Sequence, residues 1–301
     1  MATIETLWAG MITADSGTDS SIVLIINEPS APADVVQFTF PDTGQSDQEA
    51  NQANLYEIKE EDFAQRGGRV FDHLKLNLSS IRLAIRGSDQ WEVGSFFVWG
   101  EARDGLIVPL GLVTGRQSGP GVLSSFILST DVDEARVSVP IPRVQLGSSL
   151  IIIRRMMMLL STADEDDAGT DDLINLKITT IDGRVVVDHD FKDTLQDDLE
   201  QGEANFYFVP VDITFNLPEL NDESIVLSIK GKDAWLPDRL FLFGLSDAED
   251  KELVEFVVPV VHLPRWNLGT LSKDPDEGRE SVPLPLVDTP AIPPTPTGPI
   301  L

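Results

Sequence analysis

The chain has 301 residues, of which 42% are hydrophobic, and its 50 Asp and Glu outnumber 22 Lys and Arg to give a formal net charge of −28. This apolar content excludes a disordered acidic tail, and the charge argues against nucleic acid as a partner because phosphate binding depends on Lys and Arg. The sequence contains no cysteine, which excludes disulfides, thiolate metal sites and cysteine nucleophiles.

Short segments of strand character fill the first half of the chain. In residues 81–86 apolar and polar side chains mostly alternate, which places one face of a strand on a core and the other in solvent. Similar patterns predict strands at residues 22–26, 35–40, 70–78, 96–99, 122–128 and 136–141, and a helical turn at 58–65. Clusters of Gly, Pro, Asp and Asn separate these strands, as is typical of antiparallel β-sandwiches.

The second half of the chain carries a matching series. Its predicted strands occupy residues 173–179, 184–190, 205–215, 225–230, 240–243, 253–261 and 281–286, with a short helical turn at 194–201. The most apolar run, residues 150–160, contains Arg154 and Arg155 and is shorter than the ~20 residues of a membrane-spanning helix. We therefore interpret this run, which includes Met156 to Met158, as a buried strand.

The end of the chain differs in composition. Seven prolines occur among residues 283–301, and proline disfavours both helix and strand pairing. An extended arm of polyproline type is expected there. Such an arm either stays disordered or lies along a partner, and we favour the first interpretation.

The two halves of the chain are similar to each other. Residues 80–91 align with 224–235 at an offset of 144, with seven identical residues. Three further landmarks keep the same order, with 17–20 over 169–172, 96–100 over 240–244, and 129–136 over 272–279. Four landmarks at a nearly constant offset indicate an internal duplication. We predict an all-β protein with two tandem antiparallel β-sandwiches of about eight strands each, at residues 1–145 and 146–286, and a proline-rich tail at 287–301.

The second copy contains a longer ordered series of elements. A Gly-Thr-Asp-Asp turn at 169–172 is followed by Leu-Glu-Gln-Gly at 199–202, by Trp235, and by Trp266 before an acidic turn at 274–280. In this order the elements resemble the PLAT family, named after polycystin, lipoxygenase and alpha-toxin, and the first copy matches the family less closely. The resemblance implies eight-stranded sandwiches that attach to membrane surfaces, sometimes with calcium, or to proteins.

Residues for catalysis are not recognisable in the sequence. The histidines His73, His189 and His262 are isolated, and there is neither a Gly-x-Ser-x-Gly elbow nor a Walker loop. Pairs of carboxylates are frequent, but they are expected among 50 acidic residues without any catalytic role. We predict that the protein is not an enzyme, and an acid-based hydrolase is kept as a remote alternative.

Acidic loops are the candidate metal sites, because Ca²⁺ binds six to eight oxygen atoms from carboxylates, carbonyls and water. The candidate ligands in the second copy are Asp164, Asp166, Asp167, Asp171, Asp172, Asp274 and Asp276. Their counterparts in the first copy are Asp15, Asp19, Asp131 and Asp133. The alternative interpretation is that these acids are solvated and cap their loops. Calcium is the one cofactor that the sequence suggests.

The tryptophans divide into two groups. Trp91 and Trp235 occupy matching positions beside a strand, which predicts a place in the core of each copy. Trp8, Trp99 and Trp266 are not placed by the repeat, and lipid-binding sandwiches tend to expose aromatic side chains on loops.

These features predict a non-catalytic interaction or structural protein that binds protein partners or forms a homo-oligomeric assembly. The alternative is a peripheral binder of membrane lipid, in which calcium bridges acidic loops to headgroups, since the charge alone opposes an anionic surface. Adaptation to high salt is a further account of the acid excess, because 31 Asp exceed 19 Glu and Lys is scarce. Neither a signal peptide nor a membrane span is expected, so the protein is made in the cytoplasm, and its final location is left open.

Overall fold

The computed structural model describes residues 3–29, 35–41, 48–64, 71–114, 116–117, 123–124, 126–131, 133, 135–191, 199–247 and 254–287. The predicted helical turn at 194–201 and the proline-rich tail lie mostly outside these residues. No helix among the described residues is long and apolar enough to cross a membrane.

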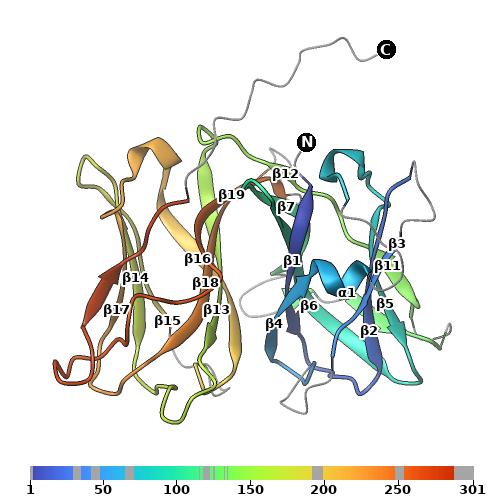
Figure 1. Cartoon of the computed structure of the whole chain (residues 1–301), viewed down its shortest axis with the longest axis horizontal. Helices are drawn as coiled ribbons and strands as arrows, with labels where there is room; N and C mark the ends of the chain where they lie inside the picture. The colour runs from blue at the N-terminus through green and yellow to red at the C-terminus, as the bar shows by residue number, and fades with distance from the viewer. Residues whose placement is uncertain are drawn as a thin grey trace.

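The first sandwich consists of two facing antiparallel sheets (Figure 1). Its inner sheet has the order β10 (Phe126–Ser129), β6 (Gln90–Ala102), β1 (Ile4–Thr13) and β4 (Ala53–Lys59), and β7 (Ile107–Thr114) also pairs with β6. Its outer sheet has the order β11 (Ser138–Pro140), β5 (Ile81–Arg86), β2 (Ser21–Asn27) and β3 (Val35–Thr39). A short β8 (Arg116–Gln117) pairs with β9 (Leu123–Ser124).

The second sandwich repeats this arrangement. Its inner sheet has the order β16 (Ala204–Phe215), β13 (Ile153–Thr162), β18 (Pro237–Asp247), β19 (Val254–Leu263) and β12 (Gln145–Leu146). Its outer sheet has the order β15 (Val185–Phe191), β14 (Ile174–Thr179), β17 (Ile225–Ile229) and β20 (Ser281–Pro283). The predicted all-β sandwich class is thus confirmed. The helical elements among the described residues are α1 (Glu60–Ala64), η1 (His73–Lys75) and η2 (Leu217–Glu219).

The strand predicted at residues 70–78 is wrong, because this segment contains the 3-10 turn η1. The Asp72 carboxylate accepts a hydrogen bond from the N–H of Leu74 at 3.0 Å and caps that turn. Leu74 and Leu78 are 73% and 76% exposed, so these two apolar residues do not face a core, whereas Phe71 and Leu76 pack against the core of the first sandwich. Local capping therefore overrides the apolar pattern at this point.

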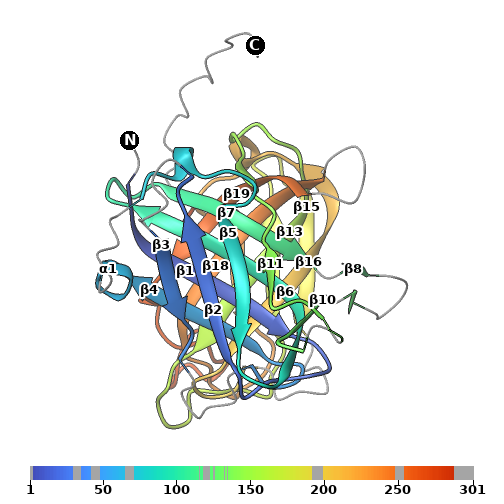
Figure 2. The same ribbon diagram turned by 90° about the vertical axis from the view of Figure 1, so that its right-hand side faces the viewer.

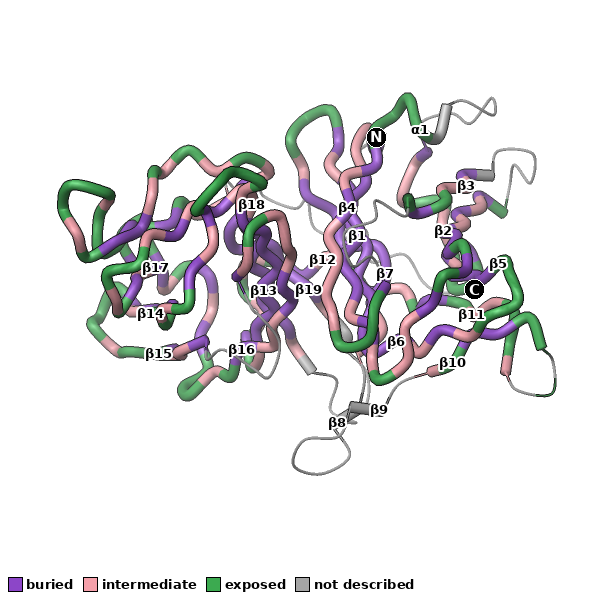
Figure 3. Tube along the Cα trace, turned by 90° about the horizontal axis from the view of Figure 1, so that it is seen from below, coloured by how far each residue is buried: buried purple, intermediate pink, exposed green. Residues whose placement is uncertain are grey.

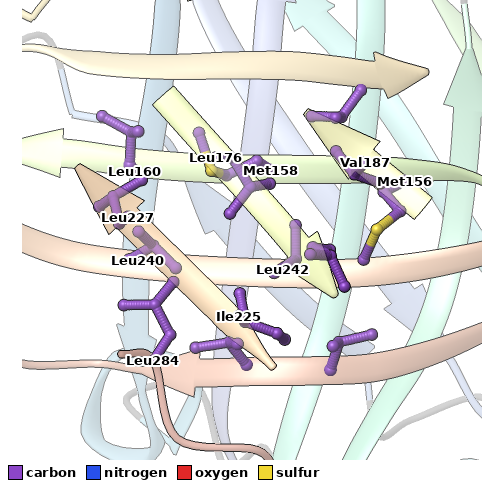
Figure 4. Packing of buried hydrophobic residues seen from close by; sticks show 14 of the residues in the cluster. Met156, Met158, Leu160, Leu176, Val187, Ile225, Leu227, Leu240, Leu242 and Leu284 are labelled. Atoms are coloured by element: carbon purple, nitrogen blue, oxygen red, sulfur yellow. The ribbon is translucent and has the colours of Figure 1, made fainter. Parts of the chain in front are cut away.

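Strand β13 shows why the most apolar run of the chain is buried on both sides. Met156, Met158 and Leu160 point into the core of the second sandwich, where they meet residues of β14 and β17 (Figure 4). Met157 and Leu159 point to the opposite side and belong to a different apolar cluster. The buried strand predicted at residues 150–160 is confirmed from Ile153 onward, where burial of both faces explains the continuous hydrophobicity. Leu150 and Ile152 precede the strand and are 71% and 49% exposed.

The core prediction for the two matching tryptophans is also confirmed. Trp91 and Trp235 are fully buried, and each indole N–H donates to a threonine hydroxyl at 3.0 Å, Thr13 in the first sandwich and Thr162 in the second. Burial of an indole is favourable when its N–H has such a partner. The same tryptophan–threonine hydrogen bond thus forms in both sandwiches.

A third apolar core lies between the two sandwiches. The inner sheets face each other, and the strands that meet there are buried over most of their length (Figure 3). The cluster consists of Trp8, Phe97, Trp99, Ile107, Leu112, Val144, Met157, Leu159, Phe206, Phe241, Phe243, Leu245 and Val257. The molecule therefore has four layers of sheet with three cores between them, and the outer sheets form its two ends (Figure 1).

Candidate functional site

The acidic turn before β14 is held by two hydrogen bonds to a neighbouring loop. The backbone N–H of Asp233 donates to Oδ2 of Asp172 at 2.7 Å, and the N–H of Asp171 donates to Oδ2 of Asp233 at 3.3 Å. The Asp172 carboxylate lies over Gly231, where a Cβ atom would come within 1.7 Å of it. The Asp172 carboxylate therefore ties two loops together at this end of the second sandwich.

The first sandwich has the same contact with a hydroxyl in place of one carboxylate. The N–H of Asp19 donates to Oδ2 of Asp89 at 3.3 Å, and the N–H of Asp89 donates to Oγ of Ser20 at 3.1 Å. Ser20 packs on Gly87, where a Cβ atom would lie 2.2 Å from its oxygen. Because serine fills this place in the first sandwich, the position requires a hydrogen-bond acceptor and not a charge.

The Asp-x-Asp turns of the two copies share one local structure. Oδ1 of Asp274 accepts the N–H of Asp276 at 3.0 Å, and Oδ1 of Asp131 accepts the N–H of Asp133 at 2.9 Å. In both turns a serine two residues earlier accepts the N–H of the first aspartate. These are Asx turns, so the first acid of each turn shapes the loop.

The remaining candidate ligands, Asp15, Asp164, Asp166 and Asp167, lie in exposed turns. Oδ1 of Asp164 accepts a hydrogen bond from Nε2 of Gln201 at 3.2 Å. Across the part of the chain that the structure describes, no three His, Asp or Glu side chains gather in a way that could hold a metal ion. The calcium site therefore stays a prediction, and three of its proposed ligands, Asp131, Asp172 and Asp274, shape turns through their carboxylates.

We expect Asp172→Ala to lower the free energy of unfolding by about 1–2 kcal/mol, because the Asp233 N–H loses its acceptor. Asp172→Asn keeps an acceptor oxygen and should cost less. Urea denaturation measures both, and Asp222→Ala, which removes an exposed acid, is the matched control with an effect within about 0.5 kcal/mol. Equal losses for the alanine and asparagine variants would show that charge, and not the acceptor, stabilises the turn.

The contact between the sandwiches was not predicted from the sequence. Phe97 is equivalent to Phe241 by the offset of 144, and Trp99 is equivalent to Phe243. The ring centroids of Phe97 and Phe243 are 4.8 Å apart, and those of Trp99 and Phe241 are 5.0 Å apart. Phe97 thus contacts the residue equivalent to Trp99, and Trp99 contacts the residue equivalent to Phe97. This exchange is the pattern of a two-fold symmetric interface.

Backbone pairing closes both edges of this contact. At one edge Ala53 of β4 pairs with Ala204 of β16, and these residues belong to matching strands. At the other edge the linker between the sandwiches runs between β7 and β19. There the carbonyl of Pro142 accepts a hydrogen bond from β7, and the N–H of Gly147 donates to β19. The two inner sheets therefore enclose the third core from both sides.

A charged group lies at the rim of the third core. Nη2 of Arg239 is 3.7 Å from Oε2 of Glu57, so an ion pair joins the two sandwiches. The Arg239 guanidinium also lies 5.4 Å from the centre of the Trp8 ring, within the range of a cation–π contact. Both side chains of the ion pair between Arg239 and Glu57 are partly exposed, and such pairs add little stability, about 0–1 kcal/mol.

Burial raises the pKa of Glu101 on β6, and the negative charges of Glu57 and Glu5 act in the same direction.

The three histidines lie on separate elements: His73 on η1, His189 on β15 and His262 on β19. The ring of His262 lies 4.8 Å from that of Phe241, and burial lowers its pKa to about 4. Burial also lowers the pKa of His189. Their separation agrees with the isolated positions of these residues in the sequence.

The other tryptophans are placed by the tertiary structure. Trp8 and Trp99 are buried in the third core, with ring centroids 6.2 Å apart. Trp266 is partly buried against the second sandwich, and its indole N–H donates to the carbonyl of Gly269 at 2.7 Å. None of these three rings is an exposed aromatic on a loop tip. The sequence signal for Trp99 was its place in an apolar run without polar alternation, which indicates burial of both strand faces.

No protein-family model and no curated protein matches the chain. Among solved structures, alpha toxin from Clostridium absonum is similar to this chain at 18% sequence identity with a TM-score of 0.29. The match covers 40% of this chain and 30% of the toxin, so the chain spans less than a third of that protein. This likeness is too distant to carry an argument about function.

Proposed function

We propose that the protein is a non-catalytic interaction or structural protein, whose two β-sandwiches act as one rigid body to bind protein partners or to build a larger assembly. The third core carries this proposal. Each inner sheet is buried on both faces, one against its own sandwich and the other against the neighbouring sandwich. The outer sheets and the end loops are therefore the surfaces that can meet a partner.

The placement of the polar residues supports a binding role over a catalytic one. The histidines lie on three separate elements, and Asp172, Asp131 and Asp274 accept hydrogen bonds that shape turns. General acid–base catalysis requires such groups to converge on one reacting atom. A net charge of −28 keeps a protein with two large outer faces soluble and favours contacts of complementary charge.

A calcium-dependent binder of lipid surfaces is the second candidate function. It is favoured by the turn at residues 164–167, where Asp166 and Asp167 are exposed and make no side-chain hydrogen bond or ion pair with a described residue. Carboxylates of this kind are available to a hard cation, which could in turn bridge to phosphate headgroups. The PLAT resemblance of the second copy supports the same candidate.

Flotation with vesicles of phosphatidylcholine and phosphatidylserine, with and without calcium, separates the two functions. We expect no flotation in either condition, together with a protein that cross-links to this chain and co-purifies with it from the native source. Calcium-dependent flotation that is lost in the Asp166→Asn, Asp167→Asn double variant, but kept in Asp222→Asn, would favour the lipid binder. The asparagine variants suit this turn because Asp167 has a φ of 61°, which asparagine tolerates.

A further inference from the structure

The outer sheet of the first sandwich faces the viewer in Figure 2. Its solvent-facing side carries three arginines. On β5, Ile81, Leu83 and Ile85 point into the core, so Arg82 and Arg86 point outward. Arg136 is exposed just before β11, and this segment stays beside β5 because the N–H of Ile85 donates to the carbonyl of Val137. The three positive charges therefore lie on one sheet face.

Two of these arginines have neutral partners. Arg82 donates to the hydroxyl of Ser138, and Nη2 of Arg86 donates to Oε1 of Gln37 at 3.1 Å. Arg86 lies on β5 and Gln37 on β3, the strands on either side of β2. Their hydrogen bond therefore passes over Val23 of β2, whose side chain points away from the core and is nevertheless fully buried. None of the three arginines forms an ion pair with a described residue. Each guanidinium carries more N–H donors than the described contacts use.

The second sandwich provides an internal comparison for this face. Lys230 matches Arg86 at the offset of 144, and its ammonium is paired with the Asp190 carboxylate. Asp188 and Asp190 stand on β15 at the places where β3 carries Gln37 and Thr39. The carboxylates that neutralise this face in the second sandwich are therefore absent from the first. In a chain with 50 acids and 22 bases, an unneutralised arginine face is a specific feature.

The same chain presents a surface of the opposite charge. Residues 164–167, with the sequence Asp-Glu-Asp-Asp, form an exposed turn at the end of the second sandwich. No ion pair to a described residue neutralises this turn. This turn belongs to the second sandwich. The arginine face belongs to the outer sheet of the first sandwich, at the opposite end of the four-layer molecule (Figure 1). The two surfaces of one chain therefore cannot meet each other.

We propose that the arginine face formed by Arg82, Arg86 and Arg136 binds the acidic turn at residues 164–167 of a second copy of this chain. Guanidinium groups pair with carboxylates through two parallel N–H···O bonds, which gives such a contact direction as well as affinity. The contact is heterologous, so a bound pair of chains keeps one free face and one free turn, and the assembly grows into a ring or an open filament. This inference rests on the assembly-building form of the proposed function.

Sedimentation equilibrium over a concentration series at ~0.15 M salt tests the proposal, because this salt screens the long-range repulsion between acidic chains more than direct contacts. The average mass of the intact protein should rise with concentration above the 33.0 kDa of one chain. The Arg82→Gln, Arg86→Gln, Arg136→Gln variant should associate at least about tenfold more weakly. The Lys177→Gln, Lys230→Gln variant, altered on the equivalent face of the second sandwich, is the matched control and should associate like the wild type.

A charge exchange makes the test independent of folding defects. Glu165→Arg with Asp166→Arg should abolish association, and so should Arg82→Asp with Arg86→Asp; mixing these two variants should restore it. A wild-type mass of 33.0 kDa at all concentrations, or equal association of the arginine variant, would overturn the proposal. A monomeric wild type that still co-purifies with another protein would overturn only this inference and leave the proposed function standing.

Discussion

Replacing Phe241 with alanine should lower the free energy of unfolding by about 3–5 kcal/mol. The Phe241 ring is fully buried between the sandwiches, with its centroid 4.9 Å from Trp8, 5.0 Å from Trp99 and 4.8 Å from His262. Its loss removes apolar burial and leaves a cavity lined by both sandwiches. Urea denaturation followed by tryptophan fluorescence measures the change.

The same experiment shows whether the sandwiches unfold together. In the wild type we expect one cooperative transition, because the third core and the closed edges couple the two copies. A charged replacement, Phe241→Asp, should separate the unfolding of the two sandwiches into two transitions. Ile213→Ala, which changes a half-exposed side chain on β16, is the control and should shift stability by about 0.5 kcal/mol or less. Two transitions already present in the wild type would contradict the rigid-body description.

Acidification from pH 6.5 to 4 should weaken the contact between the sandwiches through His262. Burial lowers the pKa of this imidazole from 6.5 to about 4, so between these values the unfolded chain binds a proton that the folded chain does not. The contribution of His262 to stability is therefore complete above pH 6.5 and falls as the pH drops, by about 1.4 kcal/mol per pH unit and about 3 kcal/mol in all.

The variant His262→Leu isolates this effect. It keeps an apolar side chain against Phe241 and Trp8 but cannot take up a proton, so the loss of stability below pH 6.5 should become shallower by about 1.4 kcal/mol per unit. Glu101 remains in both proteins and acts in the opposite direction, because its raised pKa favours the folded state on acidification. Denaturant midpoints at several pH values give the two slopes. Parallel slopes for wild type and variant would rule out His262 as the group responsible.

The candidate site shows where reasoning from sequence succeeds and where it stops. Asp274 and Asp131 were identified as acids in equivalent turns, and the Asx turns that they form follow from local chain geometry. The hydrogen bond from the Asp233 N–H to the Asp172 carboxylate joins residues 61 positions apart in the sequence. Without the fold, these two residues could not be recognised as partners. The failure of residues 70–78 to form a strand has the opposite cause, since a local cap at Asp72 prevailed over an apolar pattern.

The sequence by itself determined the all-β class, because alternation of apolar and polar residues with a period of two is a local property of strands. It also determined the burial of Trp91 and Trp235, because a large aromatic repeated at one strand position has its place in a core. Only the tertiary structure decided that the inner sheets pack on each other and that Arg82, Arg86 and Arg136 form no ion pair with a described residue. Apolar runs such as residues 96–99 indicate burial on both faces, but the identity of the covering surface depends on contacts between strands more than 100 residues apart. Such contacts form when the folded sheets bring their faces together, and no local pattern specifies them.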